Sequence, residues 1–204
     1  MICLDYQLAF IHINKNGGTS FEETLRPFET DPELVENHGP AFQMASVLGQ
    51  DVYGKLETFA IVRNPFDRFV SSYEYRRQKL SPVDAPITWL PWETSFETFI
   101  HEWVVPRPFN RELGPQGYFI NDSVGEGPIV KHIFQFEDGL DQVLAAMIRI
   151  CGLPEDLRLP EMKINETKRR PWQDYFKGKP ELVRIVAERC QGDDRYGYDL
   201  DPFS

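Results

Sequence analysis

The sequence predicts an α/β protein with a P-loop-like three-layer fold, in which a central, mostly parallel sheet is flanked by helices. Strand-like and helix-like segments alternate along the chain, as they do where helices connect the strands of a parallel sheet. Two apolar runs, at residues 8–13 and 58–62, each end in a polar turn that leads into a helix. With 204 residues, 41% of them hydrophobic, the chain can bury a core, and we expect a single domain over residues 1–204.

The remaining elements follow from periodicity and stop signals. Helices are predicted at 41–48, ending at Gly49, and at 96–104, capped by Ser95. A third strand is predicted at 129–136, and further helices at 139–151 and from about Pro180. Two proline-rich stretches, 80–94 and 105–128, are predicted to be long loops, which in compact domains are usually functional. We assign both loops to the recognition of a substrate.

The turn after the first strand carries the residues of a phosphate-binding loop. It reads Asn-Lys-Asn-Gly-Gly-Thr-Ser over residues 14–20 and runs into a helix. Backbone N–H groups at a helix N-terminus bind anions, and glycines allow the ligand to approach the backbone. The lysine precedes the glycines, whereas in nucleoside triphosphatases it follows them, so an ordinary ATPase loop is excluded. The predicted cradle consists of Lys15, Asn16, Gly17, Gly18, Thr19 and Ser20.

The second strand leads into a similar corner. Arg63 follows the strand, Asn64 is suited to cap a helix and Pro65 to begin it. Arg63 therefore lies at the carboxyl end of a strand, where open α/β sheets bind ligands. Ser71 follows about 10 Å further along the helix, given a rise of 1.5 Å per residue. An anion held by Arg63 and Ser71 would lie beside this helix.

These two segments resemble the 5′-phosphosulfate loop and the 3′-phosphate motif of sulfotransferases that use 3′-phosphoadenosine 5′-phosphosulfate (PAPS). The likeness is closest to the carbohydrate and heparan sulfate 2-O-sulfotransferase-like branch, whose loop reads roughly His-Ile-Pro-Lys-Thr-Gly-Gly-Thr-Ser. This chain departs from that loop at Asn14 and Asn16, in place of proline and threonine. The second motif, residues 62–73, matches the family almost residue for residue.

The resemblance implies an enzyme that transfers a sulfuryl group from PAPS to a hydroxyl of a carbohydrate or small-molecule acceptor, leaving 3′,5′-ADP and using no metal. Lys15 would stabilise the leaving 5′-phosphate, and Arg63 and Ser71 would bind the 3′-phosphate. Two alternatives remain: a nucleotide-dependent kinase of P-loop-like fold, and a non-catalytic nucleotide-binding protein. Arg68 is expected to form a structural ion pair.

His38 is the candidate base for the acceptor hydroxyl, because it lies between the two motifs and histidine titrates near neutral pH. The relatives carry a base histidine at a similar place. A loop-structuring role for His38, or a carboxylate as the base, remains open. His12 and His132 fall inside predicted strands and are expected to have structural roles, and His101 has no motif around it.

Three later segments are similar to elements of the family. Residues 165–172, including Lys168, are a candidate adenine-covering loop, although a solvated basic linker is an equal alternative. Residues 115–118, Pro-Gln-Gly-Tyr, resemble an element near the acceptor cleft. Residues 194–199 resemble a C-terminal packing segment and are expected to be structural.

Net charge and cysteine content indicate which binding partners and which structural cross-links to expect. The net charge of −10 argues against nucleic acid or a polyanionic polysaccharide as the default partner, although local basic residues could still line a pocket. Three widely spaced cysteines suggest neither a disulfide framework nor a zinc site. No membrane span or signal sequence is recognised, so we expect a cytoplasmic protein, unless the chain is a fragment of a longer Golgi-type protein. The oligomeric state is left open.

Overall fold

The structure, a computed structural model, describes residues 1–84, 87–108, 110–161 and 166–203. The chain divides into two compact units, each assembled from two separate stretches of sequence. The first unit comprises Met1–Arg63 and Gln116–Ile164, and the second comprises Asn64–Pro115 and Asn165–Ser204. The single domain expected over residues 1–204 stays a prediction.

The first unit contains a four-stranded sheet in the order β1-β2-β3-β4. The strands are β1 (Ile2–Cys3), β2 (Leu8–Ile11), β3 (Glu57–Val62) and β4 (His132–Gln135). Strands β2, β3 and β4 are parallel, and β1 pairs with β2 in the antiparallel direction. The predicted α/β class with a mostly parallel sheet is confirmed. All residues of β2 are buried, which explains why that strand reads as a continuous apolar run.

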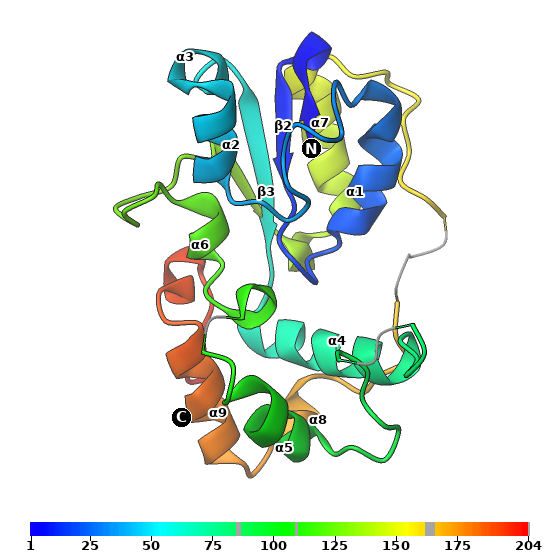
Figure 1. Cartoon of the computed structure of the whole chain (residues 1–204), viewed down its shortest axis with the longest axis vertical. Coiled ribbons are helices and arrows are strands. Elements are labelled where there is room, and N and C mark those ends of the chain that lie inside the picture. Colours follow the sequence, from blue (N-terminus) through cyan, green and yellow to red (C-terminus); the bar gives the residue numbers. More distant parts are fainter. Residues whose placement is uncertain (85–86, 109, 162–165, 204) are drawn as a thin grey trace. The chain divides into compact units, whose positions relative to one another are not determined.

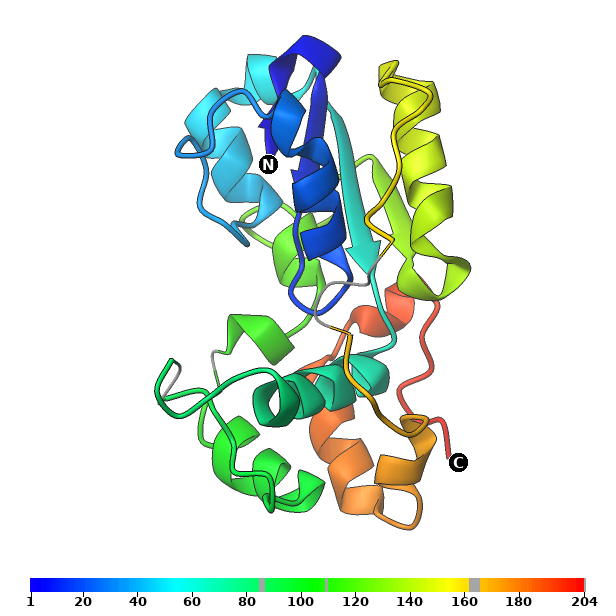
Figure 2. The same ribbon diagram turned by 90° about the vertical axis from the view of Figure 1, so that its right-hand side faces the viewer.

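Helices cover both faces of this sheet (Figure 1). The helices of the first unit are α1 (Gly18–Leu25), α2 (Ala41–Leu48), α3 (Gln50–Tyr53), α6 (Gly117–Ile120) and α7 (Leu140–Cys151). Helices α1 and α7 lie on one face and α2 and α3 on the other, as Figures 1 and 2 both show. The central layer and its two helical layers therefore agree with the predicted three-layer arrangement.

The apolar stripes of α1 and α7 form the main core of the first unit. Phe21 of α1 and Met147 of α7 pack in one cluster with Phe10 of β2 and Phe59 of β3. Phe10 and Phe59 are paired in the register of the sheet, so both rings lie on the same face. This packing fixes the corner between β2 and α1, because both elements are held by the same cluster.

The second unit is helical. Its helices are α4 (Pro65–Gln78), α5 (Phe96–Thr98), α8 (Gln173–Phe176) and α9 (Pro180–Arg189), with a π-helical stretch at Phe99–Val104. As predicted, the Asn64 side chain caps α4 by accepting hydrogen bonds from the N–H groups of Phe66 and Asp67. The apolar face of α4 is buried in a cluster with the aromatic residues of α5, the π-helical stretch and α8.

The structure differs from the predicted elements most clearly in three segments. The third predicted strand is shorter, His132–Gln135 in place of 129–136. The helix predicted at 96–104 is α-helical only to Thr98 and π-helical beyond. The predicted loop 105–128 contains α6 and a single 3₁₀ turn at Arg111–Leu113. Short local segments of this kind carry no strong periodicity, so a pattern of apolar residues does not distinguish them from irregular loop.

No helix in the part of the chain that the structure describes is both long enough and apolar enough to cross a bilayer.

Candidate active site

The predicted phosphate cradle lies between the end of β2 and the start of α1. Gly17 has a φ of 80°, in the left-handed region, and is the N-cap residue of α1. A Cβ at Gly17 would lie 2.9 Å from the side chain of Leu140. A Cβ at Gly18 would lie only 2.1 Å from Cδ2 of His12, and the His12 ring is 7% exposed. Glycine is therefore required at Gly17 by both backbone and space, and at Gly18 by space alone.

The first turn of α1 offers N–H groups to a ligand. The first N–H groups of any helix lack intrahelical acceptors. Of the backbone hydrogen bonds described here, one joins the N–H of Ser20 to the carbonyl of Gly17 at 3.3 Å, whereas Gly17, Gly18 and Thr19 donate none. These three groups lie at the positive end of the helix dipole. The corner thus has the donors that an anion site needs.

A buried amide network holds the loop against the sheet. The Asn16 side chain is 1% exposed, and its Nδ2 donates to the carbonyl of Ile61 at 2.6 Å and to Oε1 of Gln116 at 2.8 Å. Gln116 is fully buried; its Oε1 also accepts from the N–H of Arg63, and its Nε2 donates to the Arg63 carbonyl. The Asn16 side chain therefore anchors the loop, and its predicted contact with a ligand stays a prediction.

Arg63 joins the two motifs directly. Its Nη1 donates to the carbonyl of Lys15 at 2.6 Å, and its guanidinium lies 4.1 Å from the centre of the Phe136 ring. Arg63 is 6% exposed, so this contact is made inside the protein. The structure therefore brings Lys15 and Arg63, which are 48 residues apart, into contact at the carboxyl end of the parallel strands.

Lys15 and His38, the two predicted catalytic residues, both have a strained backbone. Among the described residues, positive φ outside glycine occurs at Gln7, Lys15 and His38, with 67° at Lys15 and 59° at His38. Such conformations cost about 1–3 kcal/mol for ordinary residues and often mark functional sites. Lys15 and His38, which the sequence predicts to be catalytic, are thus two of the three described non-glycine residues with a positive φ.

His38 belongs to a small cluster of titratable side chains. Its Nδ1 lies 3.1 Å from the carbonyl oxygen of His12, and the two histidine rings are 4.0 Å apart. The carbonyl can only accept, so Nδ1 carries a proton and Nε2 is left as the basic nitrogen. His12 in turn contacts Glu22 through Nδ1, at 2.7 Å.

Glu22 carries the negative charge of this cluster. Burial alone would raise the pKa of Glu22, but the hydrogen bond from His12 and the charges of His12 and His38 hold it below its ordinary value. His12 was expected to have a structural role, and its contacts with Glu22, His38 and Gly18 agree with that expectation. His132 likewise has a carboxylate partner, Glu57, at 2.7 Å.

Ser71 and Lys168 belong to the second unit, so their predicted contacts with the nucleotide stay predictions. Lys168 is exposed, and its backbone N–H and carbonyl are both bound by the amide of Gln78 on α4. Arg169 forms two hydrogen bonds with the carboxylate of Asp67, and Trp172 stacks on Phe66. Within the unit, residues 168–172 are therefore packed along α4, which disfavours a solvated linker. Asn165, the start of the candidate loop, lies outside the described residues.

The expected ion pair of Arg68 is wrong. Arg68 is fully buried, as a structural residue would be, but it donates to the carbonyl of Gly114 and forms no ion pair with the described residues. The residues around Arg68 in the sequence do not indicate the Gly114 carbonyl as its partner, because Gly114 lies 46 residues further along the chain.

Comparison with known proteins finds one family likeness, over the first 89 residues. A sequence model described as "Sulfotransferase family" matches residues 1–89, which include the β2–α1 turn, His38 and the Arg63 motif. Residues 1–89 are therefore similar to the sulfotransferase family. The match supports a sulfuryl-transferring enzyme in general; the heparan sulfate 2-O branch stays a prediction. Searches of curated proteins and of solved structures found no match.

Two residues of this corner, Gln116 and Glu22, were not assigned a role from the sequence. Gln116 was noted only as part of a four-residue likeness near the acceptor cleft, yet it binds Asn16 and Arg63. Glu22 was not singled out. A search for carboxylates one turn into the helix, on the side that faces the preceding strand, would have found Glu22 as a partner for His12.

Proposed function

We propose that this chain transfers the sulfuryl group of PAPS to a hydroxyl of a carbohydrate or small-molecule acceptor. The observation that carries the proposal is the contact between the two motifs: Arg63 donates to the carbonyl of Lys15 beside the N-terminus of α1. A shared location for both motifs is what a ligand with phosphates at two ends requires. The family match of residues 1–89 supports the same chemistry.

The residues present fit such a nucleotide. The N–H groups of Gly17, Gly18 and Thr19 have no backbone acceptor among the described residues, and a Cβ would not fit at either glycine. These groups would bind the 5′-phosphosulfate, and Lys15 would supply positive charge there. Arg63 would bind the 3′-phosphate, and Ser71 and Lys168 remain the further residues that the sequence assigns to the nucleotide.

In this mechanism the protein acts by positioning and by charge. PAPS supplies an activated sulfuryl group, whose transfer resembles phosphoryl transfer in having a loose, in-line transition state. Lys15 stabilises the negative charge that develops on the leaving phosphate, and preorganised N–H groups hold the anion. His38 removes the proton of the acceptor hydroxyl through Nε2, because its Nδ1 is held by the His12 carbonyl. His12 and Glu22 position His38 and balance its charge once it is protonated.

A nucleotide panel in thermal-shift assays tests the nucleotide assignment. We expect 3′,5′-ADP to stabilise the protein more than 5′-AMP or ATP with magnesium, because the 3′-phosphate has its own binding residues. Lys15→Ala should keep 3′,5′-ADP binding within about tenfold and slow transfer by about 100-fold or more, whereas Lys55→Ala, at an exposed lysine of the same unit, should change neither. A preference for ATP with magnesium would instead favour the kinase.

Labelled PAPS and a panel of hydroxyl acceptors test the transfer and its base. His38→Ala should lower the rate at neutral pH by roughly 100-fold or more while 3′,5′-ADP binding is retained. The control is His101→Ala, at an exposed histidine in the π-helical stretch. Near-full activity of His38→Ala would reassign the base. Binding of 3′,5′-ADP without turnover of any acceptor would favour a non-catalytic nucleotide-binding protein.

A further inference from the structure

The third β-to-α corner of the first unit belongs to neither sequence motif, yet it borders both of them. Strand β4 ends at Gln135, which pairs with Val62 at the end of β3. Phe136 and Arg63 are the next residues along these two neighbouring strands. Phe136 therefore lies at the carboxyl end of the parallel sheet, where open α/β sheets bind their ligands. The corner lies beyond residues 1–89, the range that the family model matches.

The ring of Phe136 contacts a predicted nucleotide-binding residue of each motif. The guanidinium carbon of Arg63 lies 4.1 Å from the ring centre, within the range of a cation–π interaction. A Cβ at Gly17, in the β2–α1 turn, would lie 3.1 Å from Cε2 of the same ring. One side chain thus packs against a glycine of the phosphate cradle and against the arginine that the sequence assigns to the 3′-phosphate.

The local backbone and the core fix the position of this ring. Phe136 starts a 3₁₀ turn, Phe136–Asp138, and its carbonyl accepts a hydrogen bond from the N–H of Gly139 at 3.2 Å. Gly139 has a φ of 97°, which residues other than glycine rarely adopt. Leu140 begins α7, and both Phe136 and Leu140 pack against the core cluster of the sheet. The ring is therefore anchored in the core that also fixes the β2–α1 corner.

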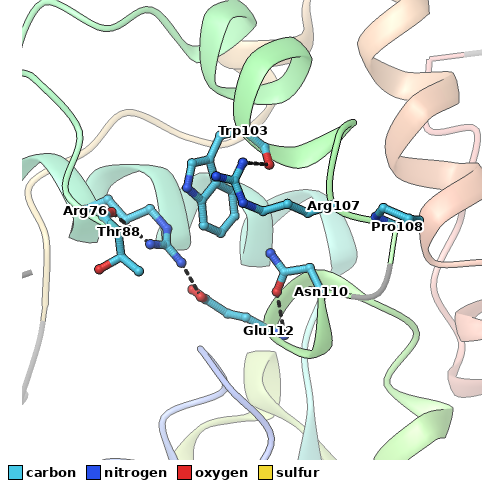
Figure 3. A pocket seen from close by; sticks show the side chains of 7 residues that line it. All are labelled: Arg76, Thr88, Trp103, Arg107, Pro108, Asn110 and Glu112. Atoms are coloured by element: carbon cyan, nitrogen blue, oxygen red, sulfur yellow. Dashed lines mark hydrogen bonds and ion pairs between the residues drawn. The ribbon is translucent and has the colours of Figure 1, made fainter. Parts of the chain in front are cut away.

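The Phe136 ring and the Lys15 carbonyl orient the Arg63 guanidinium without adding a negative charge. A ring contacts a guanidinium through its planar face, which leaves the N–H groups at the edge of the guanidinium directed at hydrogen-bond acceptors. Arg76 in the second unit also packs on a ring, 3.8 Å from the centre of Trp103, in the wall of a cavity of about 460 Å³. There the carboxylate of Glu112 pairs with Arg76 and balances its charge (Figure 3).

We propose that Phe136 is a positioning residue of the nucleotide site, whose ring holds the Arg63 guanidinium in place for the 3′-phosphate. The inference rests on the proposed function. A long, flexible side chain that becomes ordered only when a ligand binds lowers the affinity, and orientation beforehand removes this cost. Phe136 therefore contributes to selectivity for a nucleotide with a 3′-phosphate over one without it. The ring acts through Arg63 and not by contact with the phosphate.

Calorimetric titration with 3′,5′-ADP and with 5′-AMP tests this inference, because the two nucleotides differ only in the 3′-phosphate. The measured quantity is the selectivity, the Kd of 5′-AMP divided by the Kd of 3′,5′-ADP. Phe136→Leu should lower the selectivity about three- to tenfold, the cost of ordering one arginine side chain on binding, with the affinity for 5′-AMP within about twofold of wild type. Phe136→Tyr, which keeps an aromatic face, should keep the wild-type selectivity. A loss in Phe136→Tyr as large as in Phe136→Leu would overturn the inference.

Phe134→Leu is the matched control. Phe134 lies on β4 in the same unit, packs against the same core cluster, and stacks on Phe59 with the ring centres 6.4 Å apart. Both leucine variants should lose comparable stability in urea, but only Phe136→Leu should lose selectivity. Equal losses of selectivity in the two variants would show a general packing effect and would contradict a positioning role.

The effect of the ring must also depend on Arg63. In an Arg63→Ala background, Phe136→Leu should change the selectivity by less than about twofold, because no guanidinium is left to orient. A further loss of about threefold or more would mean that the ring acts on the ligand directly, against the inference. A wild type without preference for 3′,5′-ADP refutes the proposed function together with this inference. A wild-type preference that Phe136→Leu retains within about twofold refutes the inference alone.

Discussion

Replacement of Gln116 by alanine should destabilise the protein strongly, because one buried side chain satisfies three polar groups. Its amide bonds to Asn16 Nδ2 at 2.8 Å, to the N–H of Arg63 at 2.8 Å and to the carbonyl of Arg63 at 2.9 Å. Each buried group that loses its partner costs about 1–1.5 kcal/mol or more. Three such groups give a loss of about 3–5 kcal/mol in the free energy of unfolding, before any cavity is counted.

Urea denaturation followed by circular dichroism measures this loss. Gln116→Met, which keeps most of the volume, should show nearly the same loss, because the cost arises from unpaired polar groups and not from empty space. Gln142→Ala, at an exposed glutamine of α7 in the same unit, should change stability by less than about 0.5 kcal/mol. If Gln116→Ala lost less than about 1 kcal/mol, the amide network would not hold the loop and the reasoning would be refuted.

Three further predictions concern the packing at Gly18, the charge of Glu22 and the two buried cysteines. Gly18→Ala should destabilise the protein by about 1–3 kcal/mol, since its Cβ would lie 2.1 Å from the His12 ring. Gly127→Ala, with no atom within 4 Å of its Cβ, should be nearly neutral in the same urea assay. Equal effects of the two substitutions would contradict the close packing at Gly18. Because the pKa of folded Glu22 is lowered, its stabilisation is complete above its ordinary pKa of 4.5 and is lost as the pH falls through the folded value. The stability difference between wild type and Glu22→Gln should therefore shrink between pH 6 and pH 3, and a constant difference would argue against the His12 pair. Burial raises the pKa of Cys3 and Cys190 to about 12. Iodoacetamide at pH 8 should therefore label both thiols slowly in the native protein and rapidly in urea, as measured by mass spectrometry. Fast labelling of the native protein would show that the thiols are accessible.

The two β-to-α corners were predictable because their signals are local. An apolar run, a turn with glycines or an Asn-Pro start, and a helical stripe lie within about 15 residues of each other. The helix at Ala41–Leu48 was predicted with its observed bounds for the same reason, since Gly49 ends it. Helix α7 begins one residue later than expected, at Leu140, because Gly139 is its N-cap.

The contacts that complete the site were beyond sequence reasoning because they join distant residues. Asn16 and Gln116 are 100 positions apart, and nothing in the sequence around either residue indicates that their side-chain amides form a hydrogen bond. Arg63 was expected to face a ligand, yet its Nη1 holds the Lys15 carbonyl, a role that depends on the parallel register of β2 and β3. Likewise, nothing in the two proline-rich loops predicted that they border one cavity with Arg76 and Trp103.

A crystal structure of the protein with 3′,5′-ADP tests the central claim most directly. We expect the 5′-phosphate at the N–H groups of Gly17, Gly18 and Thr19, within reach of Lys15, with the 3′-phosphate bound by Arg63. A nucleotide bound elsewhere, with the β2–α1 turn making no contact to phosphate, would contradict the account.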